Sequence, residues 1–117
     1  MAVQECIYSG GGGTKVLCMT SAEAYALPTT RVECGFKPRI IMAFDSAYNT
    51  SHRLSILYNS DDINTGTTKF YQQYDGTGST QNVDSAQQLY NIDDTGFNLV
   101  YKQNYSQAGH GYIVAIE

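Results

Sequence analysis

Apolar and polar residues alternate along most of this chain with a period of two, which is typical of strands that bury one face of an antiparallel sheet. In residues 39–45, for example, Ile40, Met42 and Phe44 share one face of a predicted strand, and the residues between them share the other. The same pattern predicts strands at residues 15–19, 31–36, 53–59, 69–74, 97–102 and 112–117. Short strands at this spacing predict an all-β fold, an antiparallel β-sandwich (jelly-roll-like) of about seven to eight strands.

Helix signals are weak in comparison. Residues 21–27 contain good helix formers, with Ser21 as a suitable N-cap and Pro28 as a terminator, so we expect at most one short helical turn there. Residues 84–92 are also compatible with a helix, but the strands predicted on both sides favour strand or loop.

The sequence contains no linker, and its 117 residues have the size of one domain. We therefore expect a single β-sandwich over residues 1–117, in which residues 1–32 form an N-terminal strand and loop region. The glycine run after Ser9 is either a wide turn or a hinge that lets residues 1–8 reach a neighbouring chain, and the turn is the simpler interpretation.

Composition narrows the classes of function. The formal net charge is −4, with only seven Lys and Arg residues. This argues against nucleic acid and against an anionic membrane surface, because both are bound by clustered basic side chains. Ten tyrosines and four phenylalanines supply all the aromatic rings. A tyrosine combines an apolar ring with a polar hydroxyl, which suits half-buried faces and contact surfaces.

The first residues contain neither a basic start nor a long apolar run, so we expect no signal peptide and no transmembrane segment. Three cysteines, Cys6, Cys18 and Cys34, form no close pairs, and only His52 and His110 would complement them as zinc ligands. We expect buried free thiols that behave as small apolar groups, with no metal and no cofactor.

Two nearly identical stretches, LYNSDD and LYNIDD, begin at residues 57 and 89, and each precedes a Thr-Gly pair. Adjacent residues of an extended segment point in opposite directions, so neither pair of aspartates encloses a calcium ion by itself. Asn, Asp and Gly are also the residues that turns prefer. We interpret both stretches as turns, and an ion shared between the two loops is the alternative.

No catalytic constellation follows from the sequence. It lacks a Gly-x-Ser-x-Gly motif, its glycine run lacks the spacing of a phosphate loop, and no spacing singles out a pair among the eleven acidic residues. His110 lies between two glycines and is interpreted as a turn residue, with an exposed contact residue as the alternative. We therefore expect a protein that is not an enzyme.

Four short motifs stand out because of their order and spacing: CGFKPRIIMAF from Cys34, INTGTTKFYQQY from Ile63, IDDTGFNLVY from Ile92 and GYIVAIE from Gly111. Together they resemble a family of small C-terminal domains on phage and prophage tail or fibre proteins, over residues 33–117. The motif residues have structural roles. Pro38, for example, cannot donate a ladder hydrogen bond and so favours a sheet edge or the start of a strand. Family members end long fibres, whereas here the domain follows a short N-terminal region, so a stand-alone virion protein and a fragment of a longer one both stay open.

The resemblance implies a virion protein, made in the host cytoplasm, whose tail or fibre tip recognises a host-surface glycan without catalysis. Expected partners are other virion proteins, host cell-surface polysaccharide and further copies of the chain. A trimer is expected because fibre tips commonly assemble about a three-fold axis, which multiplies weak contacts to a repetitive polymer. Nucleic acid binding and membrane insertion are not expected. The alternatives are a structural virion component, such as a capsid decoration or baseplate part, and a free-standing lectin-like module.

Sugar binding favours aromatic rings beside hydrogen-bonding side chains, which selects three groups of residues near polar loops. The expected ligand contacts are Tyr71, Gln73 and Tyr74; Tyr48, Asn49 and His52; and Tyr105, His110 and Tyr112. Packing in the core or between subunits is the alternative role of these tyrosines.

Overall fold

The computed structural model describes the backbone of residues 2–7, 13–48, 52–60, 70–74, 80–83, 89–100 and 102–117, and the side chains of residues 13–48, 53–60, 89–100 and 102–117. The described segments are, in chain order, β1 (Ala2–Ile7), β2 (Gly13–Thr20), α1 (Ser21–Tyr25), β3 (Arg31–Glu33), β4 (Ile40–Tyr48), β5 (His52–Asn59), β6 (Phe70–Tyr74), β7 (Thr80–Val83), β8 (Leu89–Asp93), β9 (Gly96–Leu99), the 3-10 helix η1 (Lys102–Asn104) and β10 (Gly111–Ile116). Within the described part of the chain, no helix is long and apolar enough to cross a membrane.

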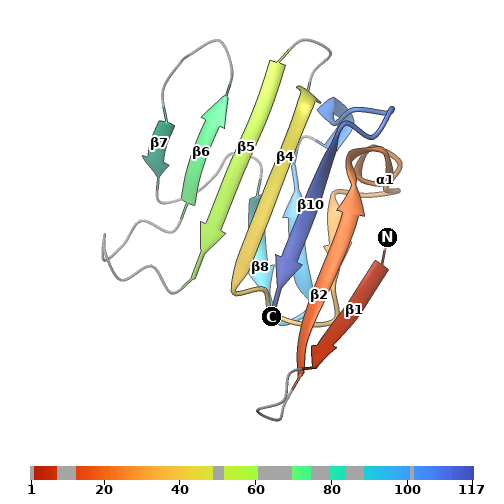
Figure 1. Ribbon diagram of the computed structural model, residues 1–117, viewed down its shortest axis with the longest axis vertical. Helices are drawn as coiled ribbons and strands as arrows, with labels where there is room; N and C mark the ends of the chain where they lie inside the picture. Colours follow the sequence, from red (N-terminus) through yellow and green to blue (C-terminus); the bar gives the residue numbers. More distant parts are fainter. Residues whose placement is uncertain are drawn as a thin grey trace.

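The strands form two antiparallel sheets, and the smaller sheet lies behind the larger one in Figure 1. The larger sheet has the order β1-β2-β10-β4-β5-β6-β7, and the smaller has the order β3-β9-β8. The C-terminal strand β10 is therefore central, because it pairs with β2 on one side and with β4 on the other. The predicted all-β antiparallel sandwich is confirmed, although its strands divide seven to three and not evenly as in a jelly roll.

Each predicted strand is present, with shifted ends, and three further strands increase the number beyond the predicted seven or eight. The additional strands are β1, β7 and β8, and each lies at an edge of its sheet. Of these, β8 overlaps residues 84–92, for which the sequence favours strand or loop over helix. Their sequences AVQECI, TQNV and LYNID carry polar residues without strict alternation. An edge strand needs a weaker burial pattern than a central one, which is why periodicity did not reveal them.

The core lies between the two sheets. Strand β4 alternates almost strictly between buried and accessible positions, with Ile41 and Ala43 pointing inward. Strand β9 of the smaller sheet contributes Phe97 and Leu99, which are fully buried. Burying a side chain such as that of Phe97 stabilises the fold by about 1.5–3 kcal/mol, so each such position contributes substantially to holding the two sheets together.

The short helix α1 forms where the sequence predicts one turn, but its N-cap is Thr20 and not Ser21. The Thr20 hydroxyl accepts a hydrogen bond from the Glu23 backbone N–H at 3.2 Å, and the Glu23 carboxylate accepts one from the Thr20 N–H at 3.1 Å. This reciprocal capping box satisfies two backbone donors at the helix start. Ser21 is fully buried instead, and its Oγ accepts a hydrogen bond from the Gly111 N–H at 3.1 Å.

Asp93, in the second aspartate pair, belongs to a turn, as predicted. Its Oδ1 accepts hydrogen bonds from the backbone N–H groups of Thr95, at 3.0 Å, and Gly96, at 3.2 Å. The guanidinium of Arg31 donates to the same carboxylate oxygen and to the Thr95 hydroxyl. These bonds hold the pKa of Asp93 near 2, well below its usual 3.8, chiefly through the Thr95 N–H and then through Arg31. The pair Asp61-Asp62 lies outside the described residues.

This network predicts a pH dependence of stability. Because the folded pKa of Asp93 lies below the unfolded value of 3.8, its contribution is complete above pH 3.8 and disappears as the pH falls through about 2. We expect an Asp93→Asn variant to lose less stability than the parent protein between about pH 4 and pH 2, as measured by urea unfolding at each pH. Asp94→Asn is the matched control. If the parent protein and Asp93→Asn lost the same free energy of unfolding between about pH 4 and pH 2, the assigned network would be contradicted.

The described thiols differ in environment. Cys34 is buried, and desolvation raises the pKa of its thiol to about 11, which agrees with the expected small apolar group. Cys18 is exposed, so the expectation of a buried thiol is wrong there. It fails because Leu17 and Met19 are the buried residues of β2, and the alternation places Cys18 between them on the opposite face of the sheet. The Cys6 side chain lies outside the described residues.

Candidate functional site

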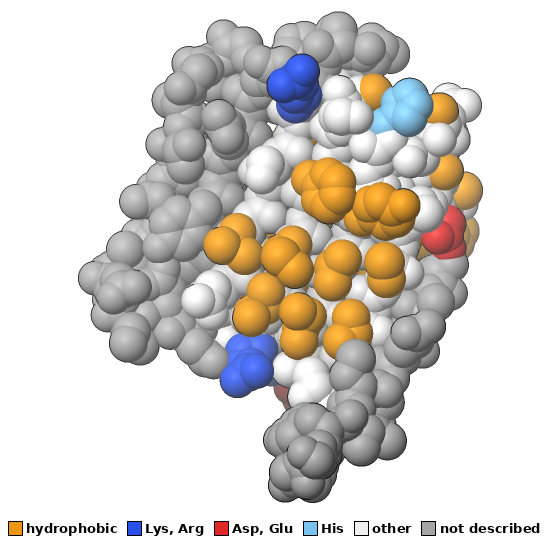
Figure 2. Space-filling view, in the orientation of Figure 1, with side chains coloured by type: hydrophobic (Ala, Val, Ile, Leu, Met, Phe, Trp, Pro, Cys, Tyr) orange, Lys and Arg blue, Asp and Glu red, His pale blue; other side chains and the backbone are white. Residues whose placement is uncertain are grey.

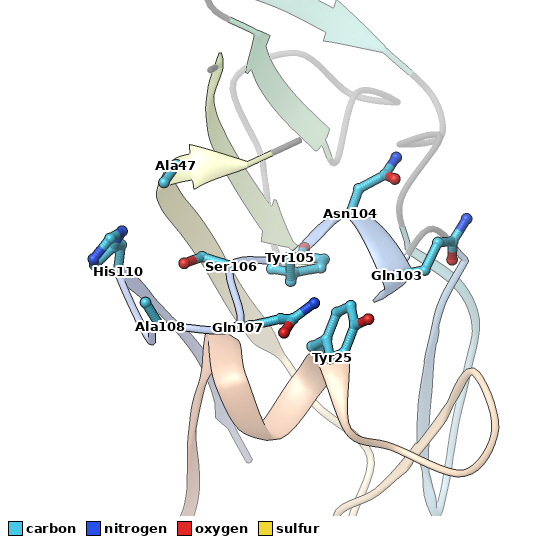
Figure 3. Close-up of a pocket in the computed structure, with 9 residues that line it drawn as sticks. All are labelled: Tyr25, Ala47, Gln103, Asn104, Tyr105, Ser106, Gln107, Ala108 and His110. Atoms are coloured by element: carbon cyan, nitrogen blue, oxygen red, sulfur yellow. The ribbon is translucent and has the colours of Figure 1, made fainter. Parts of the chain in front are cut away.

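A pocket of about 300 Å³ lies at one end of the sandwich, where α1, the end of β4 and the 102–110 segment meet (Figure 3). A volume of this size is at the lower limit of small-ligand sites. Aromatic, amide, hydroxyl and imidazole groups dominate its lining. The lining residues are Tyr25, Ala47, Gln103, Asn104, Tyr105, Ser106, Gln107, Ala108 and His110. We call it the 102–110 pocket.

The 102–110 segment is held in place from two sides. The Lys102 ammonium donates to the carbonyl of Tyr25 at 3.3 Å, which joins η1 to the end of α1. On the other side, the Ser46 N–H and hydroxyl donate to the carbonyl of His110 at 3.2 and 3.1 Å. The pocket wall is therefore fixed to both α1 and β4, although it is a loop.

A buried carboxylate makes the third attachment. Asp45 is 1% exposed, and its Oδ2 accepts a hydrogen bond from the Ser106 N–H at 2.5 Å. Its Oδ1 accepts one from the Ala47 N–H at 2.9 Å. The pairing of β4 with β5 shifts register between Asp45 and Tyr48, so a bulge turns the end of β4 toward the pocket. Asp45 thus joins the bulge to the loop.

One tyrosine lines the pocket, and a second packs against it. The rings of Tyr48 and Tyr105 meet edge to face, with centroids 5.4 Å apart, and both residues are buried. The Tyr48 hydroxyl accepts a hydrogen bond from the Asn104 amide at 3.2 Å. The Tyr105 hydroxyl is buried without a hydrogen-bond partner among the described residues. Burial raises the pKa of Tyr105 far above its usual value, with smaller contributions from Tyr48 and Asp45, so the phenol stays protonated.

The mouth of the pocket is formed by exposed side chains. Tyr25 is 37% exposed, and Gln107 and His110 are also exposed. Figure 3 shows the Gln107 amide pointing toward the Tyr25 ring, with His110 at the opposite end from Gln103. An aromatic ring beside a primary amide is an arrangement that contacts both the apolar face and the hydroxyl groups of a sugar.

A second surface is apolar. The face of the larger sheet that points away from the smaller sheet carries a cluster of hydrophobic side chains over β2, β10, β4 and β5 (Figure 2). We call it the outer apolar face, and it consists of Val16, Cys18, Ile40, Met42, Phe44, Leu57, Tyr112, Val114 and Ile116. Its exposed large members are Met42, Phe44, Leu57 and Tyr112, at 38–46% exposure. Antiparallel sheets usually place polar residues on such a face, so this cluster needs an explanation.

The predicted contact residues fall into different places. Tyr105 and His110 line the pocket, and Tyr48 supports it from beneath. Tyr112 lies on the outer apolar face, where its ring contacts that of Phe44 at a centroid distance of 5.8 Å. The backbones of Tyr71, Gln73 and Tyr74 lie in β6 and that of His52 begins β5, but their side chains lie outside the described residues, as does all of Asn49.

Sequence reasoning missed Tyr25, Gln103, Asn104 and Gln107, which also line the pocket. Tyr25 belongs to the one predicted helical turn. Gln107 belongs to a loop in which only the flanking residues Tyr105 and His110 were predicted to contact a ligand. These residues meet because α1 and η1 lie against each other. The Lys102 to Tyr25 hydrogen bond that joins them spans 77 positions in the sequence. No local pattern predicts a contact of that range.

Within the described residues, no three His, Cys, Asp or Glu side chains come together as a metal site. Comparisons of the chain with family models, curated proteins and solved structures found no match. The resemblance to phage tail and fibre domains therefore stays a prediction from four motifs.

Proposed function

We propose that this chain is a non-enzymatic protein of a phage or prophage virion, at the tail or fibre tip, and that it recognises a host-surface carbohydrate through the 102–110 pocket. The observation that carries the proposal is the lining of the pocket. An exposed tyrosine ring, three primary amides and a serine surround a volume of about 300 Å³, and none of the lining residues is Asp, Glu, Lys or Arg. A site of this chemistry suits neutral sugars better than anionic or cationic ligands.

The buried base of the site adds support. A hydroxyl that is buried without a partner is rare in folded proteins, and among the described residues the Tyr105 hydroxyl has none. The attachments through Asp45, Ser46 and Lys102 hold the pocket wall in one conformation before a ligand arrives. A rigid site loses less conformational entropy on binding than a mobile loop does. Partners in the virion and synthesis in the host cytoplasm are what the resemblance of the sequence implies.

The first test uses a panel of neutral hexoses and N-acetylhexosamines with the full chain. We expect at least one sugar to shift the backbone NMR signals of residues 103–110, with weak affinity for a single unit. Replacing Tyr25 or Gln107 by Ala should weaken that binding about tenfold, since an aromatic contact or a hydrogen bond contributes about 1–1.5 kcal/mol.

Tyr90→Ala is the matched control, because Tyr90 is 41% exposed on β8 of the other sheet. It should bind the sugar like the parent protein. Thermal unfolding of all three variants checks that each one folds. Sugar shifts that are confined to other surfaces, or that persist in Tyr25→Ala and Gln107→Ala, would contradict the pocket as the carbohydrate site.

The outer apolar face favours a second candidate, a structural virion component that binds its own particle and no ligand. Such a component needs an apolar contact surface and no sugar site. The two candidates differ in which variants matter. Loss of particle attachment with Met42 or Leu57 substitutions, together with no sugar binding by the parent protein, would favour the structural component.

A further inference from the structure

We propose that two copies of this chain associate face to face through the outer apolar face and form a two-fold symmetric dimer. This inference goes beyond carbohydrate recognition, because none of the residues of that face lines the 102–110 pocket. It concerns the partner that covers the exposed side of the larger sheet.

The outward-pointing residues form regular rows across four strands. In the middle row, Cys18 pairs with Val114, Val114 with Met42 and Met42 with Leu57. The row at one end contains the Phe44 and Tyr112 rings, with Thr20 and Ser55 at its ends.

The row at the other end begins with Val16 and continues through Ile116 and Ile40, with Asn59 at its far end. No charged residue occurs at any position of the three rows. Figure 2 accordingly shows hydrophobic side chains in the centre of this face and basic side chains only toward its ends.

The size of this grid fits the centre of a dimer interface. Four strands about 4.8 Å apart and five residues at about 3.4 Å per residue give about 14 Å in each direction between backbones, or about 400 Å² once the side chains are included. Two such faces together would bury about 800 Å² of mostly apolar surface. Stable interfaces bury about 1,200–2,000 Å² in total, of which a polar rim supplies part. The outer apolar face therefore supplies the core of an interface of modest size.

The chemistry of the face favours a second copy over another partner. The outer apolar face offers few hydrogen-bonding groups to a sugar. In the middle row and in the row that begins with Val16, the only amide or hydroxyl side chain is that of Asn59. Complementary charge gives much of the specificity between different proteins, and this grid has no charged residue to supply it. A second copy offers a sheet with the same twist and the same lack of charge, and two such sheets pack well face to face at a small angle.

Two-fold pairing also follows from the number of apolar surfaces. A three-fold assembly needs two different contact patches on each subunit, whereas a two-fold dimer uses one patch twice. In the part of the chain that the structure describes, the remaining exposed large hydrophobic residues are Tyr25 and Tyr90, which lie apart from this face on α1 and β8. The geometry therefore points to a dimer, where the sequence resemblance implied a trimer.

The solution mass tests the inference. Light scattering coupled to gel filtration, over about 5 to 500 µM of the 117-residue chain, should show a reversible change from monomer to dimer. Met42→Asp and Leu57→Asp should each weaken dimerisation at least tenfold, because each places a charge at the centre of a buried apolar contact. Tyr90→Asp, an equally exposed position on the other sheet, should leave the dimer unchanged. Circular dichroism and thermal unfolding verify that each variant folds.

Cys18 gives a readout that needs no change to the face. In a Cys6→Ser background, alkylation of the exposed Cys18 thiol by a maleimide should slow as the protein concentration passes through the dimerisation range, while buried Cys34 stays unreactive. A monomer at all concentrations, a trimer, or a dimer that survives both Asp substitutions would overturn the inference. Sugar binding is measured separately on the pocket variants, so failure of one proposal does not affect the other.

Discussion

A Gly111→Ala variant is expected to lose about 4 kcal/mol or more of folding free energy. A Cβ atom at this position would lie 2.0 Å from the carbonyl oxygen of Phe44 and 2.6 Å from the Cα of Asp45. Both contacts are with backbone, so no side chain can rotate away to make room. Strand β10 lies between β2 and β4, and a shift away from β4 would push it into the other neighbour.

The loss has a second component. The Gly111 N–H donates a buried hydrogen bond to the Ser21 Oγ, and any displacement of the strand leaves both groups without a partner. An unsatisfied buried group costs about 1–3 kcal/mol. Domains of this size are stable by about 5–15 kcal/mol in total, so we expect Gly111→Ala to lose a large share of its stability and to unfold at a much lower urea concentration than the parent protein.

Urea unfolding, followed by circular dichroism, measures this effect directly. Gly35→Ala is the control, because its added Cβ has no atom within 4 Å. The control still places a side chain at a φ of +80°, which costs about 1–2 kcal/mol. If Gly111→Ala were as stable as Gly35→Ala, β4 and β10 would not approach each other as closely as the structure shows.

Periodicity predicted which residues of a strand share a face, but not which face is inside. In β4 the bulkier set, Ile40, Met42 and Phe44, points outward, and the smaller set points toward the second sheet. Strand β10 repeats this arrangement, since Ala115 is buried and Tyr112 is 45% exposed. Both sets are apolar, so the sequence alone cannot choose between them. The choice depends on how closely the two sheets pack, which is a property of the whole fold.

The same limit applies to the pocket. The turn around Asp93 was predictable because its hydrogen bonds join residues two or three positions apart. The pocket was not, because Tyr25 and Gln107 come together only once β2, β10 and β4 are paired and α1 lies against η1. Local chemistry is visible in a sequence, whereas contacts between distant segments require the topology.

Asp45 combines a local contact with a long-range one, because its buried carboxylate connects the sheet to the pocket wall. It accepts one N–H from the β4 bulge and one from Ser106 in the loop. The described residues place no Lys or Arg within ion-pair distance of it, so these two N–H groups are its stabilising partners. Hydrogen bonds to an ionised group contribute about 1.5–3 kcal/mol each.

We expect Asp45→Ala to lose about 3 kcal/mol of folding free energy, because it removes both bonds and leaves the Ala47 and Ser106 N–H groups unsatisfied. Asp45→Asn retains one carbonyl acceptor but turns an NH₂ group toward the other N–H, so its loss should be intermediate. At a temperature where Asp45→Ala is still folded, the NMR signals of residues 103–110 should broaden while those of β9 stay sharp. An Asp45→Ala protein within about 0.5 kcal/mol of the parent would show that Ser46 and Lys102 hold the loop without the carboxylate.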